Sequence, residues 1–259
     1  MVIGAQDNDM QRDYAYTVSR KASLLQSASA VGIEAAKATV DRLGARKINT
    51  ANVPVLLHRD IASSLFGHYV GAISGGSLYR RSSFLLDSLG KQVFPEWLNI
   101  EERPFIKGGL ASSSFDNEGV ACSDMTIVDA GKLATYLYTT YSSRKLNTRS
   151  NGHAGGIHNW LVGDTGHSDA DLLKEMGTGL FVTELMGQGV NGVTGDYSRG
   201  AAGYWVENGI IQYPVHEVTI AGNLKDMFKG IVAIGAEKDV RGSVQTGSVL
   251  IDQMKIAGS

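Results

Sequence analysis

The chain has 259 residues, is 43% hydrophobic and 19% charged, and carries a formal net charge of −2, which excludes the broad positive field that draws proteins to nucleic acid or anionic membranes. Its single cysteine, Cys122, excludes an internal disulfide, and no apolar run reaches the roughly 20 residues of a membrane-spanning helix. With no signal peptide at the N-terminus, these features predict a soluble, cytoplasmic protein without direct nucleic-acid or membrane contacts.

Residues 1–25 are predicted to be the end of a preceding domain or strand. Residues 1–5 have an apolar strand pattern, and residues 12–23 alternate loosely as a second strand. A strand so near the N-terminus usually needs a pairing partner, so we expect that a region before Met1 is missing. The main domain is predicted over residues 26–259.

Helical patterns alternate with strands in the first half. An Ala-rich helix is predicted over residues 27–43, with Gly44 as its C-terminal stop. A second helix is predicted over residues 61–74, capped by Asp60 and closed by Gly75-Gly76. The remaining helical patterns cover residues 79–89, 168–176 and 223–228.

Strand patterns dominate the second half. Asn208-Gly209 is the strongest short hairpin signal, and Asp129-Ala-Gly131 marks another turn between strands. Because hairpins pair antiparallel, the predicted fold class is α+β, with mostly antiparallel sheets and a few packed helices. The predicted strands cover residues 53–57, 126–128, 133–138, 179–186, 203–206, 210–213, 215–220 and 249–256.

Three histidines, His153, His158 and His167, lie in or near a glycine-rich stretch. Zinc sites favour closed spacings such as i and i+4 on a helix, whereas His153 and His158 are five apart across Gly155-Gly156. Hydrogen-bonding or peptide-contacting histidines are therefore favoured, and a zinc site in the loop remains the alternative.

Two further polar features were weighed for chemistry. Cys122 has no histidine near it in sequence, so a structural thiol is favoured over a nucleophile. The segment 195–200, Gly-Asp-Tyr-Ser-Arg-Gly, is the densest polar cluster between predicted strands. Arg199 fits either a ligand carboxylate or a salt-bridged turn. No complete metal-hydrolase or nucleophile-hydrolase centre is evident.

Several long strings stand out in the chain. They are Phe66-Gly-His-Tyr-Val-Gly-Ala, Ser83-Phe-Leu-Leu-Asp-Ser-Leu-Gly, Gly152-His-Ala-Gly-Gly-Ile-His-Asn-Trp, Gly187-Gln-Gly-Val with Thr194-Gly-Asp-Tyr-Ser-Arg-Gly-Ala-Ala-Gly, and Val218-Thr-Ile-Ala-Gly-Asn-Leu-Lys-Asp. Together they resemble the TldD/PmbA family of peptide-processing metallopeptidases, and the chain is most similar to its PmbA type, also called TldE. The likeness runs over essentially the whole chain but covers only the later part of a family member, so the resemblance implies that the family's N-terminal region is absent.

The resemblance implies a two-subunit enzyme. A TldD-type subunit holds zinc through His-Glu-x-x-x-His on a helix and a cysteine in its last segment, and a PmbA-type subunit helps to enclose an unfolded peptide. Here Gly67, His68 and Ala72 occupy the positions of the two histidines and the glutamate, and residues 234–248 contain no cysteine. The resemblance therefore implies a degenerate metal site, with no metal or catalytic residue in this chain and zinc in the partner.

The expected function is that of a PmbA/TldE-like subunit in peptide maturation or degradation, with a TldD-type catalytic subunit and unfolded peptide as partners. Polar side chains beside glycines and strand ends are expected to line a peptide groove or the subunit interface. They are His153, His158, Asp196, Ser198 and Arg199. The alternative is a self-associating peptide-binding module without hydrolytic activity, consistent with a homodimer when the chain is alone. The family's older description as a modulator of gyrase suggests a nucleic-acid regulator, which the balanced charge disfavours.

Overall fold

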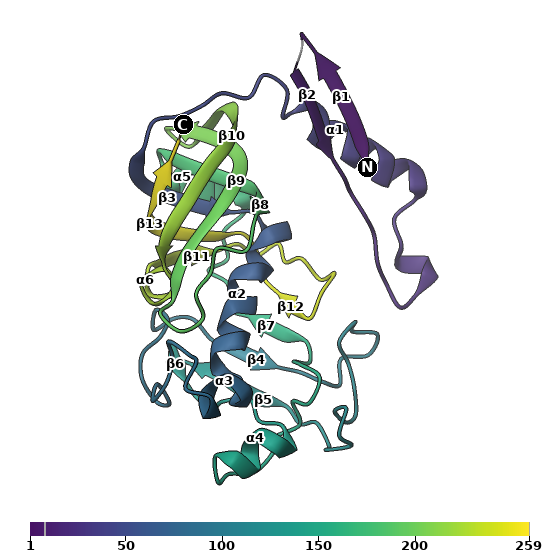
Figure 1. The fold of residues 1–259 in the computed structure, drawn as a ribbon. Coiled ribbons are helices and arrows are strands. Elements are labelled where there is room, and N and C mark those ends of the chain that lie inside the picture. The colour runs from purple at the N-terminus through teal and green to yellow at the C-terminus, as the bar shows by residue number, and fades with distance from the viewer. Residues whose placement is uncertain (8, 259) are drawn as a thin grey trace.

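The computed structural model describes residues 1–7 and 9–258 (Figure 1). The helices are α1 (Ala28–Val40), α2 (Arg59–Ile73), α3 (Gly75–Tyr79), α4 (Thr140–Lys145), α5 (Asp169–Met176) and α6 (Leu224–Lys229), with a 3₁₀ turn, η1 (Ala22–Leu24). The strands are β1 (Val2–Gln6), β2 (Asp9–Asp13), β3 (Ala51–Leu57), β4 (Ile100–Glu102), β5 (Met125–Asp129), β6 (Lys132–Leu133), β7 (Trp160–Val162), β8 (Gly179–Met186), β9 (Asp196–Glu207), β10 (Ile210–Asn223), β11 (Ile231–Ile234), β12 (Val244–Gln245) and β13 (Val249–Ala257). Within the described ranges, no helix has the length and apolar character to cross a bilayer.

Two larger sheets and one hairpin make up the β-structure. The first larger sheet has the order β10-β9-β8-β3-β13-β11, and an additional pairing of β10 with β13 closes it on itself. The second has the order β12-β7-β4-β5-β6. Pairing is antiparallel except between β3 and β8 and between β7 and β12. The predicted α+β class with mostly antiparallel sheets is confirmed.

Helix α2 lies between the two larger sheets and joins their cores (Figure 1). Its fully buried Tyr69 packs against Phe94, Trp160 of β7 and Phe228 of α6, with ring centroids 4.9, 6.0 and 5.7 Å away. Leu65 of the same helix is also buried. Burial of each such apolar side chain contributes about 1.5–3 kcal/mol, so the core fixes α2 relative to both sheets.

Local turn chemistry explains the elements that were predicted well. Asn208 and Gly209 both have positive φ, 53° and 75°, which is the requirement of the two-residue turn that joins β9 to β10. Ser168 caps α5 by accepting from the backbone N–H of Asp171, whose carboxylate accepts in return from Ser168. These signals act within a few residues, so a sequence pattern is sufficient to place them.

Two predicted helix boundaries are wrong around α2. The helix begins at Arg59 with His58 as its N-cap, and the His58 ring accepts from the backbone N–H of Asp60 at 3.4 Å. Asp60 therefore lies in the first turn. Gly75 and Gly76 do not close the helix but begin α3, because the Ser74 hydroxyl caps a new turn there.

The predicted helix over residues 79–89 is also wrong beyond Tyr79, where the chain continues as turns. Ser83 accounts for part of this difference, because its hydroxyl donates to the Ala72 carbonyl at 2.6 Å and accepts from the Leu85 N–H at 2.9 Å. Such side-chain bonds compete with helical ones. Arg81 has a φ of 55°, which is incompatible with a helix.

The N-terminal segment differs from the predicted strand over residues 12–23. The strand β2 ends at Asp13, and β1 pairs with β2 in an antiparallel hairpin from Val2–Asp13 to Gln6–Asp9. Helix α1 packs on this hairpin beside the rest of the fold (Figure 1). The first strand thus finds its partner within the chain. The assignment of residues 1–25 to a preceding domain stays a prediction.

Candidate functional site

An exposed face of α2 borders the first candidate site. Gly67 and Gly71 are exposed, and a Cβ atom added to either would meet nothing within 4 Å. Above Gly67 lies a cavity of ≈570 Å³. Its walls are α2, the loop that contains Gly155 to Ile157, and the segment that leads into β12. At Gly67 and Gly71, a chain approaching α2 would meet backbone rather than a side chain.

The three positions implied for zinc do not share this face. Ala72 is 3% exposed and belongs to the core, because five residues place it about 140° around the helix from Gly67. Gly71, at i+4, shares the face of Gly67. His68 has the only donor side chain of the three positions.

His68 lies close to Tyr197 of β9. Its Nε2 is buried without a hydrogen-bond partner in the described residues, and its ring lies 5.9 Å from that of Tyr197. Burial, and then the positive charge of Arg199, lower the pKa of His68. His68 is therefore a neutral imidazole at pH 7.

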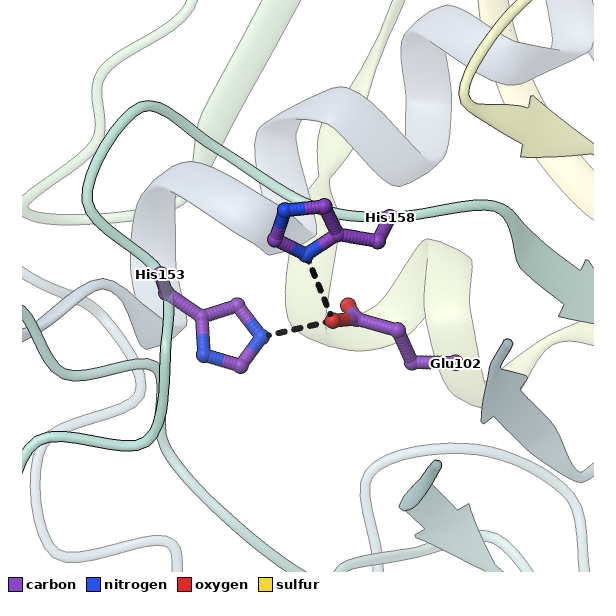
Figure 2. Close-up of side chains that lie close together, drawn as sticks. All are labelled: Glu102, His153 and His158. Atoms are coloured by element: carbon purple, nitrogen blue, oxygen red, sulfur yellow. Dashed lines mark hydrogen bonds and ion pairs between the residues drawn. The ribbon is translucent and has the colours of Figure 1, made fainter. Parts of the chain in front are cut away.

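A second, fully buried cluster brings two of the predicted residues together (Figure 2). His153 Nε2 and His158 Nδ1 lie 3.0 and 3.1 Å from the same oxygen of Glu102, Oε1. The three residues are 6%, 8% and 1% exposed. Figure 2 shows both rings directed at the carboxylate from the loop that precedes β7. We call Glu102, His153 and His158 the buried His–Glu cluster.

Neighbouring groups hold this cluster in place. Trp160 Nε1 donates to Glu102 Oε2 at 2.6 Å, and Asn151 Oδ1 lies 2.9 Å from His153 Nδ1. Burial by itself raises the pKa of Glu102, but the close approach and charge of His153 and the bonds from Trp160 and His158 outweigh it and lower the pKa. Glu102 is therefore a carboxylate at neutral pH.

Cys122 adjoins the far side of His158, with Sγ 3.5 Å from Nε2. Burial, followed by the negative charges of Asp116 and Glu102, raises the pKa of the Cys122 thiol. A nucleophilic cysteine needs a lowered pKa, so the structure disfavours that role in spite of the adjacent histidine.

The other predicted group lies on β9 rather than between strands. Asp196 begins the strand, and the alternation places Asp196 and Ser198 at the surface and Tyr197 in the core. Asp196 accepts from Thr194 Oγ1 at 2.6 Å, while Arg199 has a buried Nε without a hydrogen-bond partner in the described chain. The predicted position of residues 195–200 between strands is wrong, because residues 196–200 belong to β9 and pair with β10; this excludes the salt-bridged turn and leaves the ligand role of Arg199 as a prediction.

The structure therefore separates the five predicted residues into two groups. Within residues 1–7 and 9–258, no hydrogen bond or ion pair joins His153 or His158 to the three residues of β9. His153 and His158 lie in the loop that leads into β7 of the second larger sheet, whereas the other three residues belong to β9 of the first.

A family model described as PmbA/TldA metallopeptidase C-terminal domain matches residues 50–258. The chain belongs to the PmbA/TldD family of metallopeptidases. It is 58% identical over 257 residues to Metalloprotease PmbA of Escherichia coli O157:H7, covering 99% of the chain and 57% of that protein. It is 56% identical to the Metalloprotease PmbA homolog of Haemophilus influenzae, covering 100% of the chain and 57% of that protein. The chain thus spans less than two thirds of the length of these relatives.

Solved structures of this family share the fold. A protein of Thermotoga maritima described as a putative modulator of a DNA gyrase superposes with a TM-score of 0.91 at 31% identity, over 98% of the chain and 60% of that protein. TldE of Thermococcus kodakarensis gives a TM-score of 0.86 at 19% identity, over 99% and 61%. The second likeness shows the fold alone. The PmbA/TldE resemblance inferred from the sequence is confirmed.

In this PmbA-like chain, Glu102 was not among the residues predicted for the site, because it is 56 residues from His158. Their contact arises because Glu102 pairs with Trp160 in the register of β4 and β7. The only local signal is a carboxylate on the buried side of β4, in the same orientation as Ile100. Without knowledge of the strand pairing, that pattern does not show which residues Glu102 contacts.

Proposed function

We propose that this chain is the PmbA/TldE-like subunit of a heteromeric zinc metallopeptidase that acts on unfolded peptides in the cytoplasm. In this proposal the catalytic zinc belongs to a TldD-type partner. The observation that carries it is the face of α2, where Gly67 and Gly71 are exposed and Ala72 lies in the core. Catalytic zinc needs three protein ligands, whereas His68 is the only donor among the three implied positions.

The cavity above α2 supports a role in enclosing an extended peptide. Arg241 pairs with both Asp60 and Asp239 at the cavity wall, so each of these charged groups has an ion-pair partner, with one negative charge in excess. Gly155 and Gly156 contribute backbone to the opposite wall. A surface rich in backbone and poor in free charge suits main-chain recognition, which tolerates many peptide sequences.

The test combines the chain with a TldD-type subunit. Size-exclusion chromatography and native mass spectrometry are expected to show a mixed species, and a denatured protein substrate is cleaved only by the mixture. Self-association with no mixed species would support the alternative peptide-binding module and contradict the proposal.

Substitutions test whether each of the two predicted groups contributes to peptide cleavage. His158→Ala and Arg199→Ala are expected to reduce peptide cleavage by the mixture, and Arg149→Ala serves as a control because Arg149 is exposed. Circular dichroism of each variant checks folding. Unchanged cleavage and unchanged pairing for both variants would remove these residues from the site.

A further inference from the structure

The hydrogen bonds around Asn151 determine the chemistry of His153. Asn151 Nδ2 donates to the Tyr136 carbonyl at 2.8 Å, and its Oδ1 accepts from the Tyr138 N–H at 2.7 Å. These two bonds fix the amide orientation, so Oδ1 faces His153 Nδ1 at 2.9 Å. An amide oxygen only accepts, so His153 Nδ1 carries the proton and donates.

Because Nδ1 is committed to Asn151, the second ring nitrogen of His153, Nε2, is the one that points into the cluster. This nitrogen belongs to a side chain that is 2% exposed, lies 3.0 Å from Glu102 Oε1, and has no aligned hydrogen bond among the described residues. When His153 is a metal ligand, its Nε2 carries no proton, so two acceptors face each other at this buried position. Unpaired buried acceptors are costly, and a cation between them removes that cost.

We propose that Glu102, His153 and His158 form a buried site for a divalent transition-metal ion of the zinc class. Their donor atoms lie within 4.8 Å of one another. Zinc–ligand distances of about 2.0–2.2 Å place tetrahedral ligands about 3.3–3.6 Å apart, a few tenths of an ångström beyond the two distances of 3.0 and 3.1 Å to Glu102. Two imidazoles and one carboxylate favour zinc, cobalt or nickel over calcium or magnesium.

The surrounding residues act as an outer shell. Asn151 and Cys122 contact the second ring nitrogens of His153 and His158, and Trp160 donates to the second oxygen of Glu102. Such partners fix ring orientation at metal sites. All three ligands are under 10% exposed, so no peptide reaches the ion and its role is structural.

The site goes beyond the proposed function, whose catalytic zinc lies in the partner, and it departs from the sequence expectation of no metal in this chain. His153 and His158 flank the loop that supplies Gly155, Gly156 and Ile157 to the wall of the ≈570 Å³ cavity. An ion bound by both histidines would fix the two ends of that loop. The metal is thus a structural support for one wall of the cavity.

The experiment uses tag-free 259-residue chain, freed of metal with a chelator and titrated with Zn²⁺ and Co²⁺. We expect one ion per chain by elemental analysis, a visible Co²⁺ spectrum, a higher Tm with metal, and slower deuterium exchange in residues 154–157. Glu102→Gln is the key variant, because the amide can still accept from Trp160 and can donate to His153 Nε2. It should fold without metal and bind at least about 100-fold more weakly.

His167→Ala is the matched control, because His167 is 41% exposed at its side chain and lies outside the cluster. It should bind zinc as the unsubstituted chain does. His153→Gln provides a second ligand variant in case Glu102→Gln folds poorly. No saturable binding to the unsubstituted chain, or equal binding by the ligand variants and the control, would overturn the site. Since the measurement uses the chain alone, its result is independent of pairing with a TldD-type subunit.

Discussion

Single residues fix the loops around the buried His–Glu cluster. The Asp116 carboxylate is 3% exposed and accepts from the backbone N–H groups of Glu118, Val120 and Ala154, each at 2.9 Å. It therefore ties the turn that precedes Cys122 to the loop that follows His153. Burial by itself raises the pKa of Asp116, but these N–H donors outweigh it and lower the pKa.

Asp116→Asn should destabilise the chain by about 1–3 kcal/mol at pH 7, because the amide nitrogen cannot accept from a backbone N–H. Because the pKa of Asp116 is lower in the folded state, the carboxylate stabilises the fold at pH values above the ordinary aspartate pKa of about 3.9. This contribution to stability is lost as the pH falls through the folded-state pKa. Urea denaturation at a series of pH values should show the difference between variant and parent narrowing below about pH 4. A difference that is constant down to pH 3 would contradict this account.

The residues of the candidate site could be predicted from sequence only in part, because some of their contacts join segments that are far apart in the chain. His153 and His158 stand out because they flank two glycines in a short string. Glu102 does not, because its role depends on the register of β4 against β7. The polar residues of β9 were misplaced because the surface face of a strand has the same polar composition as a turn.

Replacing a glycine by alanine is expected to have opposite effects on stability in α2 and in β9. Gly71 is exposed with space around its Cβ position, whereas a Cβ at Gly203 would lie 1.9 Å from the Phe181 carbonyl oxygen in β8. Gly71→Ala should therefore stabilise the isolated chain by about 1 kcal/mol through helix propensity. Gly203→Ala should destabilise it by about 1–3 kcal/mol through overpacking. Equal signs for the two changes in chemical denaturation would contradict the assigned surroundings.

The same face of α2 gives a test of pairing. Gly71→Leu adds a side chain where another backbone is expected to approach, so mixing with a TldD-type subunit should weaken while the isolated chain remains folded. Lys174→Leu, at an exposed position of α5, is the control for added apolar surface. Native mass spectrometry measures the mixed fraction, and equal pairing by the two variants would show that α2 is outside the interface.

Whole elements were predicted from sequence where their signal is local. The Asn208-Gly209 turn and the Ser168 cap depend on neighbours within a few residues. Residues 80–89 have helical periodicity, but Ser83 bonds to Ala72 across 11 positions and directs the chain away from a helix. A hydrophobic period cannot reveal the hydrogen bond between Ser83 and Ala72.

Across the whole molecule, a few polar links hold the N-terminal hairpin and α1 against the larger sheets. Arg241 pairs with Asp60 and Asp239, and its guanidinium lies 4.6 Å over the ring of Tyr16. Arg42 of the segment after α1 pairs with Glu184 of β8 at 2.5 Å. The closure of the first sheet by β10 and β13 is likewise long-range, which is why sequence patterns did not predict it.

Arg241→Met removes the charge and the contact over Tyr16 while keeping an apolar stem. Chymotrypsin should then cleave near Tyr14 and Tyr16 several-fold faster, because local opening of this segment costs less. Arg149→Met is the control, since Arg149 is exposed. Mass spectrometry of early fragments reports the sites, and equal cleavage of both variants would contradict the role of Arg241.

Peptidase activity and complex formation, measured on the chain alone and with a TldD-type subunit, test the proposed non-catalytic role. We expect no cleavage by the chain alone, even with added zinc, and cleavage by a purified mixed complex whose activity requires the partner's zinc ligands. Zinc-dependent cleavage by this chain without a partner would contradict the proposed role.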